Sequence, residues 1–274
     1  MKSKPPLKPD RLSSSAITAG LKTRFIGQRT LYYPSLTSTM ELARKEARLG
    51  AAEGTLIVAG EQTAGRGRLN RAWLSPRGNI ALSLILRPKI EHLHSIIMLA
   101  SLAVVHTIET VTGLNAYLKW PNDVLIGGKK ICGILIESQV QENRVDYVIV
   151  GIGINVNMKP ADFPDISPTA TSLSDELGRQ IPRLNLIQTL LLEIEKLYLA
   201  VSTGNSIFEE WRDRLVTLGR RVQVVSGASV QDGTAESVDR EGHLLLRCPD
   251  GSLVKVLSGD VTLRDFSENR PSSR

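Results

Sequence analysis

The sequence predicts an α+β protein: a mixed, largely antiparallel sheet with helices, followed by a small C-terminal β-barrel. Short apolar runs bounded by Gly and Pro recur through the first 155 residues, with too few helical patterns between them for a doubly wound parallel sheet. From residue 220 the pattern changes to short strands separated by Gly and Asp turns. The chain has 274 residues, 42% of them hydrophobic, enough for one large and one small domain.

These patterns predict a basic N-terminal arm over residues 1–29, a main domain over 30–215 and the β-barrel over 216–274. Residues 1–30 contain seven basic residues and one acidic residue, which accounts for the whole net charge of +6. The rest of the chain is formally neutral, so a general polyanion-binding surface is not indicated. The arm is rich in proline and has no apolar segment. This composition indicates a disordered start to a cytoplasmic protein and not a secretory signal.

The first expected elements are a strand over residues 32–36 and a helix that begins after Ser38. Ser38 and Glu41 fit a capping box, and Gly50 is a natural helix end. The following elements, in order, are strands over 55–59 and 79–86, a helix over 93–111 ending at Gly113, and strands over 117–120, 124–126, 130–138 and 146–154, with a turn at 127–128.

The second half predicts a loop over 157–184 that contains a short helix over 172–177. Helices over 185–202 and 207–218 follow, before the β-barrel. The longest apolar run, 96–105, is about half of the roughly 20 residues that a membrane span needs, so no such span is expected. Two distant cysteines, Cys132 and Cys248, lie outside any metal-ligand spacing, so neither a disulfide framework nor a zinc site is expected.

The stretch Glu61–Trp73, EQTAGRGRLNRAW, has the features of an anion-binding loop. Gly65 and Gly67 allow close backbone approach to a ligand. The arginines between and after them carry planar, permanently charged groups suited to phosphate or carboxylate.

Three further stretches stand out: KWPND at 119–123, KKICGILIE at 129–137 and GIGIN at 151–155. Together with the arginine loop, in this order, they resemble the motifs of the biotin protein ligases, in the form without an N-terminal DNA-binding domain. The resemblance covers about residues 30–265, including the small β-domain.

The resemblance implies a class II synthetase-like catalytic domain that binds biotin and ATP, and a C-terminal SH3-like barrel. It implies that biotin and ATP, with Mg²⁺, form biotinyl-5′-AMP, and that a lysine of a biotin carboxyl carrier protein or domain then takes the biotin. DNA and membranes are not expected partners, and monomer or homodimer is left open.

Carried over by position, the resemblance assigns three groups of residues. The catalytic residues are Arg66, Lys130 and Asp123. The biotin-binding residues are Ser38, Thr39, Gln62, Arg66, Gly67, Arg68, Lys130 and Gly133. The ATP-binding residues are Arg66, Arg68, Arg71, Trp73, Asn122, Lys130 and Asn155. Metal ligands are not assigned. Met40 and Ala72 depart from the family pattern, where asparagine is frequent at the first position and lysine is sometimes found at the second.

Three other functions compete with this interpretation. A lipoate or octanoyl transferase shares the catalytic fold, but the arginine loop and KWPND are of the biotin type. A nucleic-acid-binding protein is disfavoured by the neutral body and by an aromatic content of 4%. A catalytically inactive biotin sensor would lack the cations, whereas Arg66, Arg68, Arg71 and Lys130 are all present.

Overall fold

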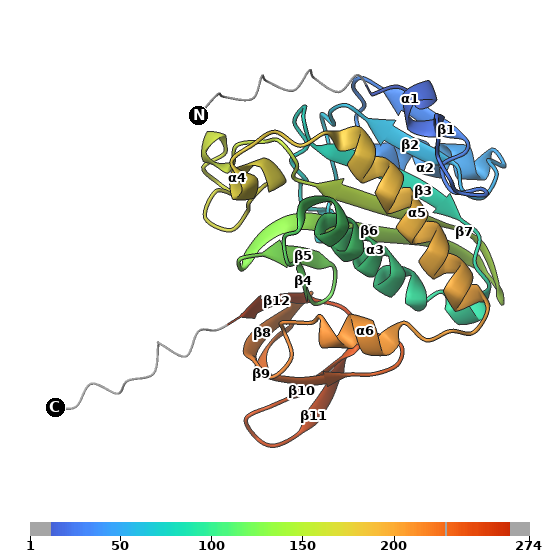
Figure 1. Cartoon of the computed structure of the whole chain (residues 1–274). Coiled ribbons are helices and arrows are strands. Elements are labelled where there is room, and N and C mark those ends of the chain that lie inside the picture. The colour runs from blue at the N-terminus through green and yellow to red at the C-terminus, as the bar shows by residue number, and fades with distance from the viewer. Residues whose placement is uncertain (1–11, 228, 264–274) are drawn as a thin grey trace.

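The computed structural model describes residues 12–227 and 229–263, which form a large and a small sheet with helices packed on the large one (Figure 1). In spatial order the strands of the large sheet are β1 (Thr30–Tyr33), β2 (Leu56–Ala59), β3 (Ile80–Leu86), β7 (Arg144–Ile154), β6 (Lys129–Gln141), β5 (Asp123–Ile126) and β4 (Tyr117–Lys119). Strands β1 and β2 are parallel, and each other neighbouring pair is antiparallel. The predicted mixed, largely antiparallel sheet is confirmed.

Helices cover both faces of the large sheet. They are α1 (Ser14–Thr18), α2 (Thr39–Arg48), α3 (Ser95–Thr112), α4 (Leu173–Leu177), α5 (Arg183–Ser202) and α6 (Phe208–Asp213), with single 3₁₀ turns at 68–70, 90–92 and 160–162. Side chains alternate along β2: Leu56 and Val58 join the core under α3 and α5, whereas Ile57 joins a smaller core with Met40 and Ala43 of α2. Helix α2 therefore lies on the face opposite α3 and α5.

Helix α3 is, within the described ranges, the one helix long and apolar enough to cross a membrane, but 61% of it is buried inside the protein. It packs against α5 and the sheet (Figure 1), and Leu99 and Leu102 are fully buried. Its apolar composition is that of a core helix.

The start of α2 differs from the predicted capping box. Ser38 is the N-cap residue, but its side chain makes no capping hydrogen bond. The backbone N–H of Thr39 instead donates to Oε1 of Gln62 at 2.7 Å. A residue of the arginine loop therefore caps the helix, which couples the position of this loop to α2.

The predicted helix over 207–218 is too long, because α6 ends at Asp213. The carbonyl of Arg214 accepts a hydrogen bond from the Leu118 N–H at 2.9 Å, and the Arg214 guanidinium pairs with Glu109 of α3. These contacts bind the chain to β4 and α3, and a continued helix could not make them.

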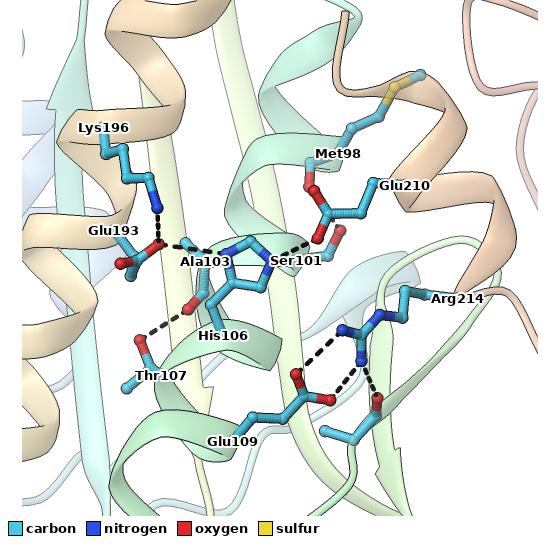
Figure 2. Close-up of polar contacts among 11 residues, drawn as sticks. Met98, Ser101, Ala103, His106, Thr107, Glu109, Glu193, Lys196, Glu210 and Arg214 are labelled. Atoms are coloured by element: carbon cyan, nitrogen blue, oxygen red, sulfur yellow. Dashed lines mark hydrogen bonds and ion pairs between the residues drawn. The ribbon is translucent and has the colours of Figure 1, made fainter.

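Polar contacts join α6 to α3 and α5 above the apolar core (Figure 2). His106 of α3 lies between two carboxylates, with Nδ1 3.2 Å from Glu193 of α5 and Nε2 2.6 Å from Glu210 of α6. The imidazole therefore links three helices.

The small sheet has five antiparallel strands in the order β11 (Leu253–Val256), β10 (Leu244–Arg247), β9 (Ser229–Val238), β8 (Arg221–Ser226) and β12 (Asp260–Leu263). Strands β11 and β12 form its edges and do not pair with each other. Val222 and Leu244 belong to the same core as α3, and the Trp120 indole N–H donates to the Gly242 carbonyl at 2.8 Å. The small sheet is thus packed firmly against the large one.

Residues 12–29 of the predicted N-terminal arm belong to the folded body. Ile17 and Ile26 are fully buried in the main core. The Glu195 carboxylate of α5 is 5% exposed and accepts hydrogen bonds of 2.7–3.1 Å from the backbone N–H groups of residues 24, 25 and 26. Residues 1–11 lie outside the described part, so the expected disordered start stays a prediction for them.

Replacing Glu195 should destabilise the fold because three backbone donors, one buried and two partly buried, would lose their acceptor. We expect Glu195→Ala to lower the free energy of unfolding by about 2–4 kcal/mol, and Glu195→Gln, which keeps one acceptor oxygen, by about 1 kcal/mol. Urea unfolding at neutral pH measures both changes. Lys196→Ala, an exposed change on the same helix, is the control, and equal midpoints for Glu195→Ala and Lys196→Ala would contradict the role of the carboxylate.

Candidate active site

Small residues in three neighbouring strands form a hollow on the α2 face of the large sheet. Gly153 of β7 lies opposite Gly133 of β6 on one side and Ala81 of β3 on the other. Two residues further along the same face, Gly151 lies opposite Ser83. Because residues i and i+2 point to the same face of a strand, these positions leave space where larger side chains would fill it. The cavity above them has a volume of about 150 Å³.

The start of α2 forms one wall of this cavity. The Thr39 hydroxyl lies 3.0 Å from Oε1 of Gln62 and accepts a hydrogen bond from the Ser83 hydroxyl at 2.8 Å. The Ser38 side chain is 3% exposed overall, and its Oγ has no hydrogen-bond partner among the described residues. A buried hydroxyl without a partner loses free energy, so Ser38 is suited to contact a polar ligand.

Two side chains cover the glycines. A Cβ atom on Gly133 would lie 2.9 Å from Cζ3 of Trp73, and one on Gly153 would lie 2.5 Å from Cε2 of the same ring. At Gly151 the nearest atom is Sδ of Met40, at 2.5 Å. The indole can lie here only because both residues beneath it lack a side chain. It occupies the space above Gly133 in which the family resemblance places biotin.

The charged centre lies beside the indole. Nζ of Lys130 is 2.6 Å from Oδ1 of Asp123 and 5.3 Å from the centroid of the Trp73 ring. Lys130 lies on β6 and Asp123 at the start of the neighbouring β5, so strand pairing holds the two groups together. The ammonium can stabilise negative charge that develops on a reacting group, and the carboxylate can accept a proton.

The arginine loop closes over the cavity as a narrow hairpin. The Trp73 N–H donates to the Gly65 carbonyl at 2.9 Å, and the Gly67 N–H donates to the Arg71 carbonyl at 2.8 Å. At its tip Leu69 and Asn70 have left-handed backbone conformations, with φ of 53° and 59°. Asparagine tolerates this conformation, but it costs free energy for a leucine, so the backbone is strained at Leu69.

The arginines of this loop differ in their partners. Nη1 of Arg68 donates to Oδ1 of Asn122 at 3.1 Å and to the Gly259 carbonyl at 3.3 Å. Burial lowers the pKa of Arg68, and the nearby carboxylates of Asp260 and Asp123 oppose that change. Arg71 forms an ion pair with Asp260, whereas Arg66 makes neither a hydrogen bond nor an ion pair with residues 12–227 or 229–263.

A second cavity of about 560 Å³ lies on the other side of Trp73. It is lined by the indole, Lys130 and Asn155 at the end of β7, and by the loop around Phe163. The Asn155 side chain is buried and donates from Nδ2 to the Thr171 carbonyl at 3.1 Å. Trp73 and Lys130 therefore border both cavities, and a ligand with two parts could extend across them.

The structure brings most of the predicted site residues together. The first cavity is lined by Thr39, Gln62, Arg66, Gly67, Arg68, Arg71, Trp73, Asn122, Asp123, Lys130 and Gly133, while Asn155 lines the second. Ser38 does not line either of them, although its neighbour Thr39 does. Sequence analysis missed Ser83 and Asp260, because neither belongs to a motif and only strand register and domain packing bring them here.

Two groups near the site have other roles. Burial raises the pKa of the Cys132 thiol, so this side chain is a packing residue on β6 and not a nucleophile. In the small sheet, Asp239, Glu241 and His243 could together hold a metal ion, but Nζ of Lys255 lies 2.8 Å from Asp239 and 3.3 Å from Glu241. The Lys255 ammonium therefore already supplies a positive charge to this cluster.

Comparison with known proteins agrees with this geometry. Residues 32–155 match the Biotin/lipoate A/B protein ligase family, and residues 217–264 match the Biotin protein ligase C terminal domain. The chain is 44% identical over 262 residues to the bifunctional ligase/repressor BirA of Bacillus subtilis (strain 168), covering 93% of this chain and 80% of that protein. It is 32% identical over 268 residues to the biotin–(acetyl-CoA-carboxylase) ligase of Mycobacterium tuberculosis, covering 94% and 96%.

The solved structure of the biotin protein ligase from Aquifex aeolicus in complex with biotin and ATP is also similar. It aligns with a TM-score of 0.74 and 30% identity over 86% of this chain and 99% of that one. These matches define the class as the biotin and lipoate protein ligases, and the sheet hollow with its clustered cations under a glycine and arginine loop is the site of this chain. Within that class, the chain belongs to the biotin protein ligase family and has biotin protein ligase activity.

The contact between Trp73 and the glycines can be tested with Gly153→Ala, which forces the indole away from β7. We expect the ring to become more exposed, and the rate of adenylate formation to fall about tenfold or more because the new methyl group fills part of the hollow in which a ligand must be placed closely. Trp120 and Trp211 are only 2% and 1% exposed, so iodide quenching of tryptophan fluorescence reports mainly on Trp73.

Trp73→Phe is the control for this measurement, since it should remove most of the quenchable emission. Unchanged quenching in Gly153→Ala would mean that the position of the indole does not depend on the glycines beneath it.

Proposed function

We propose that this cavity carries out two successive reactions, in which biotin is first activated by ATP and then transferred to a carrier lysine. In the first, a biotin carboxylate oxygen bonds to the α-phosphorus of ATP, pyrophosphate leaves, and biotinyl-5′-AMP remains. In the second, the lysine ε-amine attacks the acyl carbon and AMP leaves. The observation that carries the proposal is the Lys130–Asp123 pair beside the glycine hollow, with Nζ and Oδ1 2.6 Å apart.

Biotin is proposed to bind over the glycines of β6 and β7, once the Trp73 ring moves toward the second cavity. Gly133 offers close backbone approach there. Ser38, Thr39 and Gln62 are proposed to bind its polar ureido ring. The partnerless Ser38 Oγ and the joined Thr39 and Gln62 side chains support this assignment.

The first step brings a carboxylate and a triphosphate together, so their repulsion must be offset by cations held in place beforehand. Lys130 is proposed to lie between the biotin carboxylate and the α-phosphate. Arg66, with no partner of its own among the described residues, is proposed to bind the same centre when the loop closes, and Gly67 lets the backbone approach. Lys130 and Arg66 would thus supply two cations at the point where the two anions meet.

The nucleotide is proposed to extend from the first cavity into the second. Arg68 and Arg71 would bind phosphates, with Asn122 fixing Arg68 through its 3.1 Å hydrogen bond. Trp73 would cover the adenine, and Asn155 lines the cavity proposed for it.

Mg²⁺ is proposed to enter with the triphosphate. Asp123 and Asp260 are the carboxylates that line the first cavity, and oxygen ligands of this kind suit Mg²⁺. Both are already paired with cations, so the phosphates are the expected main ligands of the ion. When bound, the ion would neutralise charge on the leaving pyrophosphate.

Asp123 is proposed to act in the second step. The carrier lysine must be neutral to attack, and a carboxylate at the reacting centre can orient its amine and accept a proton. The short contact with Lys130 holds the carboxylate in the cavity until the acceptor arrives.

The acceptor is proposed to be a biotin carboxyl carrier protein or domain, as the name of the Mycobacterium tuberculosis relative suggests for its own acetyl-CoA carboxylase.

We propose a cytoplasmic enzyme, because both cysteines are free. A DNA partner is not expected, since the net positive charge is confined to residues 1–30. The division of the chain into domains 30–215 and 216–274 stays a proposal, and the boundary falls between α6 and β8. Monomer and homodimer both remain open as oligomeric states.

Lys130→Ala should remove the charge at the reacting phosphate while the fold is kept. With biotin, ATP and Mg²⁺, we expect pyrophosphate release to fall by at least about 10²-fold relative to the unaltered enzyme. Lys129→Ala, the exposed neighbour on β6, is the control and should keep the normal rate. Normal release by Lys130→Ala would remove this residue from the mechanism, and release that requires lipoate instead of biotin would overturn the choice of acid.

Asp123→Asn should slow transfer more than activation. In single-turnover transfer from preformed biotinyl-5′-AMP to a carrier domain, we expect biotin labelling of the lysine to fall roughly 10²-fold, the typical size of general base catalysis. Pyrophosphate release should fall less, because Asn keeps the volume beside Lys130. Asp232→Asn in the small sheet is the control, and a transfer rate equal to that control would exclude Asp123 from the second step.

A further inference from the structure

The small C-terminal sheet contributes a carboxylate to the active-site cavity. Asp260 is the first residue of β12 and lines the cavity together with the arginine loop. It forms an ion pair with Arg71, and the carbonyl of the preceding residue, Gly259, accepts a hydrogen bond from Arg68 at 3.3 Å. Strand β12 lies at the side of the small sheet that faces β4 and β5 (Figure 1). Gly259, just before β12, and Asp260, at its start, therefore hold two arginines of the loop.

These two contacts differ in how easily the arginine can leave its partner for another. Arg68 is partly buried between Asn122 of the large sheet and Gly259 of the small one. Arg71 has a side chain that is 69% exposed, whereas the Asp260 side chain is only 25% exposed. The Asp260 backbone is fixed by its pairing with Val225 of β8. The carboxylate is thus the fixed partner, and the guanidinium is the one that can move.

We propose that Asp260 is a positioning residue that holds Arg71 in the empty enzyme and yields it to the triphosphate when ATP binds. This inference rests on the proposed role of the arginine loop in nucleotide binding. Carboxylate and phosphate are both bidentate partners for a guanidinium, so they compete for the same group. When pyrophosphate leaves, the pair with Asp260 forms again and the loop returns to its starting position.

The arrangement has a cost in affinity for ATP. Arg71 must leave one anion before it binds another, and the negative charge of Asp260 stays in the cavity that receives the phosphates. Biotin, bound over the glycines and α2, is not expected to be affected. Asp260 should therefore weaken the binding of ATP without changing that of biotin.

The test measures KM for both substrates in adenylate formation. Asp260→Asn removes the charge and keeps the shape, and we expect KM for ATP to fall roughly three- to fivefold, the upper part of the range of a partly exposed charge pair. KM for biotin should stay within about twofold, and Asp260→Glu, which keeps the charge, should resemble the unaltered enzyme. The matched control is Glu236→Gln, which removes an equal charge from the Glu236–Arg247 ion pair elsewhere in the small sheet.

A double substitution shows whether Asp260 acts through Arg71. Arg71→Gln alone should raise KM for ATP, and adding Asp260→Asn to it should lower KM less than it does in the unaltered enzyme. An unchanged or higher KM for ATP in Asp260→Asn, with Arg71→Gln still raising it, would overturn this inference alone. An unchanged KM in Arg71→Gln would instead overturn the proposed phosphate role of Arg71, and the inference with it.

Discussion

The structure of the site depends on the in-register placement of residues with little or no side chain on β3, β6 and β7. Gly133, Gly153 and Ala81 lie side by side across three strands, and Gly151 lies beside Ser83 on the same face. A sheet covered on both faces normally fills every such position with a side chain, because protein interiors are close-packed. This row leaves room for an indole or a ligand, and the other elements of the site are arranged around it.

The cations around the hollow are held by partners from different parts of the chain. Lys130 is paired with Asp123 of the adjacent strand, Arg68 with Asn122 and the Gly259 carbonyl, and Arg71 with Asp260. Four positive groups so close together, Lys130, Arg66, Arg68 and Arg71, would repel one another. Each partner reduces this repulsion without filling the cavity. Arg66, which has no such partner among the described residues, can pair with an anionic ligand.

The small sheet is part of the same structural unit as the catalytic sheet. Val222 and Leu244 share the core of α3, Trp120 donates to the Gly242 carbonyl, and Asp260 reaches the cavity. Within KWPND, Asn122 and Asp123 line the cavity, while Trp120 fixes the small sheet in place. Changes in the packing between the sheets are therefore expected to reach the active site through Asp260 and the arginine loop.

The sequence by itself determined most of the secondary-structure elements, the class of fold and the residues of the four motifs. Those features depend on local patterns: Gly113 ends α3, apolar runs form the strands, and the glycines and arginines of the loop are contiguous in the chain. It did not determine where α6 ends, how α2 is capped or that residues 12–29 join the core, since Arg214, Gln62 and Glu195 act through partners distant in the sequence. Only the tertiary structure decided that Trp73 lies over Gly133 and that Asp260 enters the cavity, because strand register and sheet packing bring these residues together and neither is encoded by neighbouring residues.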